Sequence, residues 1–309
     1  MPTPSRLAAR ARALLVLAAA VAAAGVAAAP APAVTLGGWS LPQQRILVRA
    51  GLMPTLADHR FHGERRLTVA QLRHALGGLA KAYGMDRVPL PGRGTVSVAA
   101  FDRLMVEQLG LADVAVHVQR QAHRAGLSPP ARFGTEVVAR QLGLRHSFAS
   151  IDDRLELFPT DAITRAEAAW SLAIALRMPD AQIAFVADQL LGLRLPSYDA
   201  DQRRILRLAV SKIGMPYIWG GEYDTAISSG DPQSHGGYDC SGFVWRVFKL
   251  SGSPWGHLIQ GRTAAQQAGE IPRSRRIRLG SVRGADLLFF GTASFSSTAT
   301  EANVTHEIG

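Results

Sequence analysis

The chain of 309 residues contains a single cysteine, Cys240. One cysteine excludes an intramolecular disulfide, and it excludes every zinc site that is built on a cysteine pair. The histidines and carboxylates do not compensate, because no His-x-x-x-His pair or acidic cluster has the spacing of metal ligands. We therefore expect no metal and no other cofactor.

Aromatic residues are scarce, at 7%, and acidic residues are outnumbered, with 24 Asp and Glu against 34 Lys and Arg. A basic chain suits nucleic acid when its basic residues form a stripe with aromatic residues between them. Here they are scattered, and no aromatic residue lies within the densest cluster, Arg273, Arg275, Arg276 and Arg278. We expect anionic cell-wall polymers or phospholipid surfaces as partners, and no nucleic acid.

One long apolar run is present, from Ala13 to Ala29, and no later segment is long and apolar enough to cross a membrane. Three arginines precede the run and an A-x-A sequence follows it at 31–33, as is typical of a cleaved signal peptide. We predict a signal peptide over 1–33 and a secreted, wall-associated mature chain with a net charge of about +7 after loss of those arginines. A retained membrane anchor is the alternative, but the run is short and dominated by alanine.

Residues 41–180 have the apolar periodicity of short helices broken by Gly and Pro. Two stretches, 47–72 and 139–168, share an order of features: a helix that ends at Gly-Leu, a loop with a Phe, and a Thr that can cap the next helix. Thr164 and Glu167 have the spacing of a capping box, and Gln71 holds the matching position after Thr68.

This pattern resembles the S-layer homology repeat, a helical module that holds exported proteins to the wall through secondary polymers. The likeness is closest over 158–168, and the stretch 101–126 is a candidate for a further degenerate copy. It implies a wall-anchoring domain over 41–180 that binds anionic secondary wall polymers. The alternative is a helical spacer without a ligand, since repeats of this kind need at least three units to pack a continuous core.

Composition changes toward Gly, Ser and aromatic residues after a junction at 181–198, so we predict a linker there and a second domain over 199–309. Asp199 or Asp201 can cap a helix that continues to Gly214. A further helix is predicted to begin at Cys240, because apolar residues follow it at spacings of three and four up to Gly252.

A cysteine in the first turn of a helix faces unpaired N–H groups and the positive end of the helix dipole. These favour a thiolate, and the same N–H groups can hold the oxyanion of a tetrahedral intermediate. A lone thiol in an exported chain is open to oxidation, so its retention also favours a chemical use. Cys240 is thus a candidate nucleophile that needs a histidine as its base.

His306 is the favoured base, because it follows an apolar segment, 286–290, that we predict to be a buried strand. The alternatives are His235, His257 and His146, and the first two are predicted to lie in loops near Cys240. A strand that carries the histidine beside a helix that carries the thiol would place base and nucleophile on two rigid elements.

Four segments together resemble the NlpC-type cell-wall endopeptidases: 216–221 (Pro-Tyr-Ile-Trp-Gly-Gly), 238–244 (Tyr-Asp-Cys-Ser-Gly-Phe-Val), 284–290 (Gly-Ala-Asp-Leu-Leu-Phe-Phe) and Thr305-His306. The resemblance covers about 202–309. It implies an α+β, papain-like domain in which a helix-borne Cys packs on an antiparallel sheet. It also implies that Cys240 is the nucleophile, that His306 is the base, and that Tyr217, Asp239 and Ser241 lie on the substrate side.

The implied reaction is hydrolysis of an amide in peptidoglycan stem peptides, between D-glutamate and the following diamino acid, through an acyl-enzyme. An acyl transferase could use the same residues. Two departures from the family pattern stand out: an insertion at 222–237, and the lack of the third polar residue that follows the histidine's strand. We therefore expect a catalytic domain truncated at its C-terminus, and keep as the alternative a wall-binding protein with an inactive catalytic-like domain.

Overall fold

The computed structural model describes residues 37–230 and 233–290, all of which belong to one compact unit. The predicted signal peptide and His306 lie outside the described residues. Within the described part of the chain, no helix combines the length and the apolar character that a membrane span requires.

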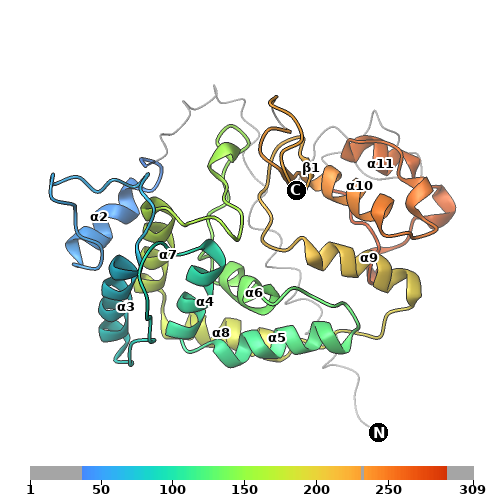
Figure 1. Ribbon diagram of the computed structural model, residues 1–309. Helices are drawn as coiled ribbons and strands as arrows, with labels where there is room; N and C mark the ends of the chain where they lie inside the picture. The colour runs from blue at the N-terminus through green and yellow to red at the C-terminus, as the bar shows by residue number, and fades with distance from the viewer. Residues whose placement is uncertain (1–36, 231–232, 291–309) are drawn as a thin grey trace, which may run out of the picture. The chain divides into compact units, whose positions relative to one another are not determined.

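Helices make up most of the structure, and Figure 1 shows their course. The first region contains α2 (Leu41–Arg49), α3 (Val69–Tyr83), α4 (Val98–Gln108), α5 (Ala112–Arg124), α6 (Phe133–Gln141), the 3-10 turn η1 (Asp153–Leu155), α7 (Arg165–Arg177) and α8 (Asp180–Leu191). The second region contains α9 (Ala200–Ser211), β1 (Glu222–Tyr223), β2 (Gly237–Tyr238), α10 (Cys240–Leu250) and α11 (Ala264–Glu270), with the 3-10 turns η2 (Gly256–Leu258), η3 (Arg273–Arg275) and η4 (Leu279–Ser281).

The first region is organised around one large apolar core that extends from Leu47 to Val186. Phe101 of α4 and Leu72 of α3 are fully buried in it. Helix α7 packs on α2 and α3, and α6 packs on α4 and α5 (Figure 1). The prediction that 41–180 is mostly helical is therefore confirmed.

Three short segments that precede α3, α4 and α7 close a ring of backbone hydrogen bonds. The N–H of Leu67 donates to Ile163 O (2.8 Å), that of Ile163 to Val96 O (2.8 Å), and that of Val96 to Leu67 O (3.2 Å). Each segment ends in a residue that caps the following helix: Thr68, Ser97 or Thr164. The third segment starts before the stretch 101–126 that was expected to hold a further copy, and the S-layer homology repeats stay a prediction.

The two predicted caps differ in detail. Thr68 and Gln71 form the complete capping box. Thr164 accepts from the N–H of Glu167, but the Glu167 side chain is buried beside Arg145, with Oε2 3.8 Å from Nη1. The Glu167 carboxylate therefore faces Arg145 and does not bond the backbone N–H of Thr164, as it would in a complete capping box.

Charged side chains are enclosed within the first region. Asp102 and Arg145 are buried, and Asp102 Oδ2 lies 4.0 Å from Arg145 Nε, too far for a hydrogen bond. Burial raises the pKa of Asp102 and of Glu167 to about 7 in each case, against the opposing effect of the Arg145 charge. Arg145 is thus the counterion of both Asp102 and Glu167, and neither carboxyl group lies within hydrogen-bonding distance of it.

The stretch predicted as a linker is not irregular throughout. Its first part belongs to α8, whose Val186 is buried in the first core. Only residues 192–199 join α8 to α9 without a helix. An amphipathic helix that can bury its apolar face against the core is more stable than an extended linker, and the domain boundary itself stays a prediction.

The second region has a much smaller core, made by Ile205, Val247, Phe248 and Ile259. Asp199, with Gln202, forms a capping box at the start of α9, which ends at Ser211 rather than near Gly214. Strands β1 and β2 pair antiparallel, with Glu222 opposite Tyr238 and Tyr223 opposite Gly237, and α10 contacts both.

The predicted strand at 286–290 is wrong for the described structure, in which these residues form no strand. Leu288 and Phe290 are exposed, and residues 287–290 make no backbone hydrogen bond to other described residues. A strand needs a neighbour for its N–H and C=O groups. The two-stranded sheet β1–β2 is the whole of the sheet within the described ranges, so papain-like packing is not confirmed.

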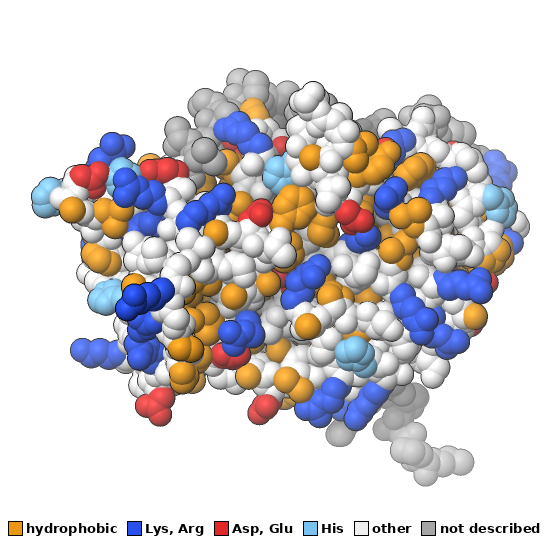
Figure 2. Space-filling model, in the orientation of Figure 1, with side chains coloured by type: hydrophobic (Ala, Val, Ile, Leu, Met, Phe, Trp, Pro, Cys, Tyr) orange, Lys and Arg blue, Asp and Glu red, His pale blue; other side chains and the backbone are white. Residues whose placement is uncertain are grey.

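Basic side chains are dispersed over the face of the molecule seen in Figure 2, among apolar and acidic ones. The view agrees with the scattered arginines of the sequence and shows no continuous basic stripe on that face.

Candidate active site

The start of α10 is the centre of the candidate site. Asp239 is the N-cap, and its Oδ1 accepts a hydrogen bond from the N–H of Gly242 at 2.6 Å. Cys240 is the first residue of the helix and is half-buried. The prediction that Cys240 opens a helix is confirmed, so the thiol is placed at the positive end of the helix dipole.

The loop 216–221 runs beside this turn and is attached to it by its backbone. Ile218 N donates to Tyr238 O (3.1 Å), and Tyr238 N donates to Pro216 O (3.0 Å). The N–H of Gly220 donates to the other oxygen of Asp239, Oδ2, at 2.9 Å. One carboxylate therefore holds both the helix start and the neighbouring loop.

Gly242 is required by this close approach. A Cβ at position 242 would lie 2.1 Å from the carbonyl oxygen of Gly221 and 2.6 Å from Nη2 of Arg262. The glycine therefore permits close packing of the loop and Arg262 against the first turn of α10.

Arg262 packs against the same turn and contacts three segments of the site. Nη1 donates to Asp239 Oδ1 (3.2 Å) and to Ser241 Oγ (3.0 Å), and Nη2 donates to the carbonyl oxygens of Gly220 (2.9 Å) and Gly221 (3.0 Å). Nε donates to Glu222. Sequence reasoning missed this residue, because nothing in its local pattern marks an arginine whose partners lie 21 to 42 residues away.

Gln267 is the second residue that sequence reasoning missed. It is buried in α11, and its Nε2 donates to Ser241 O (2.9 Å) and Gly261 O (3.2 Å). The short helix α11 thus holds the first turn of α10 through a buried amide.

The three residues predicted to lie on the substrate side are brought together near Cys240. Asp239 and Ser241 are buried, and their side-chain oxygens are bonded within the cap, with Ser241 Oγ 3.3 Å from Asp239 Oδ1. Tyr217 is half-buried and forms a bridge with Tyr238, directly before the cap. Their role toward a substrate stays a prediction.

The alternative histidines have other surroundings. The ring of His235 stacks on Phe158 with 5.3 Å between centroids, and its Nδ1 lies 2.8 Å from Gly236 O. His146 stacks on Trp39, 4.5 Å away, and burial lowers its pKa. His257 is exposed in η2. These contacts give His235 and His146 roles in packing, and the role of His306 stays a prediction.

The insertion 222–237 is closed at its base by β1–β2 and braced by Asp224. Lys212 Nζ lies 2.7 Å from both Asp224 oxygens, and the Tyr238 hydroxyl donates to Oδ1 at 2.8 Å. Burial alone would raise the pKa of Asp224, but the hydrogen bonds from Lys212 and Tyr238 lower it below its ordinary value. The pKa of Tyr238 is raised, by burial first and by the Asp224 carboxylate next.

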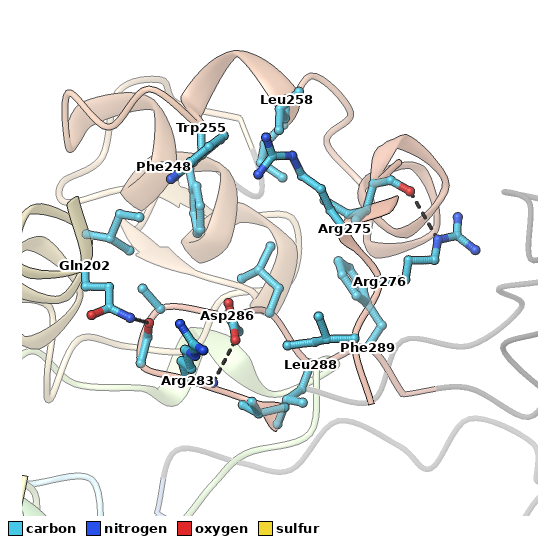
Figure 3. Close-up of a pocket in the computed structure, with 18 of the residues that line it drawn as sticks. Gln202, Phe248, Trp255, Leu258, Arg275, Arg276, Arg283, Asp286, Leu288 and Phe289 are labelled. Atoms are coloured by element: carbon cyan, nitrogen blue, oxygen red, sulfur yellow. Dashed lines mark hydrogen bonds between the residues drawn. The ribbon is translucent and has the colours of Figure 1, made fainter. Parts of the chain in front are cut away.

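A cavity of about 710 Å³ lies elsewhere in the second region and does not include Cys240, Tyr217, Asp239 or Ser241 in its lining. Figure 3 shows Phe248, Trp255 and Leu258 on one side of it and Leu288 and Phe289 on the other. The guanidinium of Arg275 lies 4.1 Å from the ring centroid of Trp255. The cavity therefore borders the apolar segment that was predicted to be a strand.

No group of three or more His, Cys, Asp and Glu side chains is arranged to hold a metal ion among residues 37–230 and 233–290. A cysteine thiol at the capped first turn of α10 is a group that can act as a nucleophile.

Residues 214–303 match the model of the NlpC/P60 family. The matched range is less than a third of the chain and contains Cys240, Tyr217, Asp239 and Ser241, while His306 lies beyond it. Members of this family are typically cysteine peptidases, and the match supports a peptidoglycan peptidase of the NlpC type over this range. No curated protein and no solved structure matches the chain.

Proposed function

We propose that the protein is an exported peptidoglycan hydrolase that cleaves an amide bond in wall stem peptides, between D-glutamate and a diamino acid. One observation supports this above the others: Cys240 stands at the capped N-terminus of α10, within the range that matches NlpC/P60. The thiolate of Cys240 attacks the amide carbonyl, the amine leaves with a proton from His306, and water then releases the acyl group from sulfur.

The described geometry supplies part of this mechanism. The Asp239 side chain accepts the Gly242 N–H, and we propose that backbone N–H groups at this end of α10 hold the oxyanion. Tyr217, Asp239 and Ser241 are proposed to form the substrate side. We propose that Tyr217 contacts the substrate directly, and that Asp239 and Ser241, which are bonded within the cap, shape the loop around it.

The test is digestion of purified peptidoglycan by the chain without residues 1–33, with released peptides identified by mass spectrometry. Cys240→Ala is expected to reduce release at least ~10³-fold, because removal of a nucleophile leaves only binding and electrostatic effects. His306→Ala should produce a comparable loss, and His235→Ala should not. Peptide release that persists in Cys240→Ala would contradict the proposal, and the mass of the product identifies the bond.

The first region is proposed to anchor the enzyme to the wall through anionic secondary polymers, in the manner of S-layer homology repeats. The ring of three backbone segments before α3, α4 and α7 supports this, because their number matches the three units that such repeats need. Binding of the Cys240→Ala chain to wall sacculi, before and after extraction of the secondary polymers, tests it. Equal binding to both preparations would contradict it.

A wall-binding protein with an inactive catalytic-like domain is the second candidate. It is favoured by the internal engagement of Asp239 and Ser241, which a substrate contact would have to displace. Wall binding without any cysteine-dependent release of peptides would establish this candidate.

A further inference from the structure

All the N–H donors of the Arg262 guanidinium form hydrogen bonds at the candidate site. An arginine has five N–H donors, and here one meets Glu222, two meet Asp239 and Ser241, and two meet the carbonyls of Gly220 and Gly221. The side chain is 31% exposed, so this network lies at the edge of the solvent rather than deep in the core. A planar fork with five aligned acceptors is a geometry that a lysine cannot reproduce.

The acceptors of Arg262 surround Cys240 along the chain. Asp239 precedes the cysteine and Ser241 follows it, and both side chains are held by the same Nη1 at 3.2 and 3.0 Å. Through Nη2, the arginine also fixes the loop whose Gly220 N–H is bonded to Asp239. The backbone of Cys240 is therefore fixed on both sides by one cation.

The charges at this turn also require that cation. Asp239 is 6% exposed, and the Glu222 carboxylate lies on the other side of the same guanidinium. Without Arg262, two carboxylates would remain near the first turn of α10, where negative charge opposes the formation of a thiolate.

We propose that Arg262 is a positioning residue for catalysis: it aligns the first turn of α10 and the loop 216–221 around the Cys240 thiolate. This inference rests on the proposed role of Cys240 as the nucleophile. A residue that merely braced the fold would change the stability of the protein, whereas a positioning residue changes the reactivity of the thiol in protein that is still folded.

The first measurement is the rate at which iodoacetamide alkylates Cys240 in the folded chain, followed across neutral pH without any substrate. Arg262→Gln removes the charge and most of the fork, and we expect the half-maximal rate to move to higher pH by about one unit. Arg262→Lys keeps the charge and loses the planar guanidinium. Its alkylation rate should therefore depend on pH nearly as that of the wild type does. Arg278→Gln is the matched control, because its guanidinium lies in the exposed basic segment outside this network.

The second measurement is hydrolysis of soluble stem peptides by the same variants. We expect Arg262→Lys to lower kcat about 10²-fold with little change in KM, because a misplaced nucleophile loses alignment rather than substrate affinity. Should Arg262→Gln fail to fold, Glu222→Gln is used in its place, because it removes the negative charge beside Nε and leaves the arginine present.

The outcomes separate this inference from the proposed function. Unchanged alkylation and unchanged kcat in folded Arg262 variants would overturn the positioning role. Alkylation that decreases only in proportion to the unfolded fraction would overturn it as well. A shifted alkylation profile in a chain that hydrolyses no stem peptide would confirm the positioning of the thiol while contradicting the hydrolase.

Discussion

The two regions of this protein are stabilised in different ways. The first buries an extensive apolar core from Leu47 to Val186 and a ring of three backbone segments. The second has a core of only four buried residues and depends on polar contacts that converge on Asp239 and Arg262. Changes in the first region should therefore act on stability, and changes in the second should act on the geometry of the thiol.

The largest effect is expected from truncation in the first core. Phe101 is fully buried, so Phe101→Ala should lower the free energy of unfolding by about 3–5 kcal/mol through lost burial and the cavity left behind. Urea unfolding followed by tryptophan fluorescence and far-ultraviolet circular dichroism measures it.

Phe248→Ala is the matched change in the second core. Phe248 borders the 710 Å³ cavity, so part of its ring already lacks neighbours, and we expect about half the cost of Phe101→Ala. Equal costs at the two positions would show that the cores are packed alike and would remove the basis of the comparison.

The next effect concerns the buried charges of the first region. The pKa of Asp102 is raised to about 7, above its ordinary value of 3.8. The folded protein therefore holds a proton that the unfolded chain releases, so this carboxyl group contributes most at low pH and its contribution falls as pH rises toward 7. Relative to Asp102→Asn, the wild type should lose up to ~1.4 kcal/mol per pH unit across that window.

Urea unfolding of both proteins at several pH values measures this slope. Asp113→Asn, at an exposed position of α5, is the control and should give no such trend. If the wild type instead gained stability relative to Asp102→Asn as pH rises, Asp102 would be ionised and paired with Arg145.

A smaller effect compares two helix caps of similar construction. Thr164 caps α7 in the first region, and Asp239 caps α10 in the second. Replacement of either by Ala should cost about 1–2 kcal/mol of stability, since each leaves an N–H of the first turn unsatisfied. We expect only Asp239→Ala to reduce peptide release, by about 10²-fold, because it also releases the loop 216–221 and Arg262. Equal activity of the two variants in the digestion assay would contradict this difference.

Much of the local structure could be predicted from the sequence. The start of α10 at Cys240 and the cap at Asp199 depend on side chains within one turn of the helix, and such contacts are encoded locally. The Thr-x-x-Glu pattern at 164–167 predicted only half of what is present, because the Glu167 side chain is buried beside Arg145, far away in the sequence.

The elements that could not be predicted depend on distant partners. The apolar run 286–290 has the composition of a strand, but composition does not show whether a neighbouring strand is available to pair with it. Arg262 and Gln267 have no signature in their own neighbourhood, although they hold the turn that carries Cys240. The placement of Cys240 at the start of a helix was thus predictable, and the residues that hold this turn were not.

The smallest effect tests whether the two regions act on one another. Asp153 of the first region accepts a hydrogen bond from the N–H of Trp219 at 2.8 Å, next to Tyr217 and Gly220 in the loop of the candidate site. Asp153→Ala should cost about 1 kcal/mol of stability. Because the loop remains attached to Asp239 through Gly220, kcat should change little, while KM for stem peptides should rise by a few-fold if Tyr217 contacts the substrate.

The control is Asp161→Ala. Asp161 lies in the same connection between α6 and α7 as Asp153, but it accepts its hydrogen bond from the N–H of Phe158, within the first region. Identical KM values for the two variants would show that the first region stabilises the protein without shaping its site, and the two regions would then be separate in function as well as in construction.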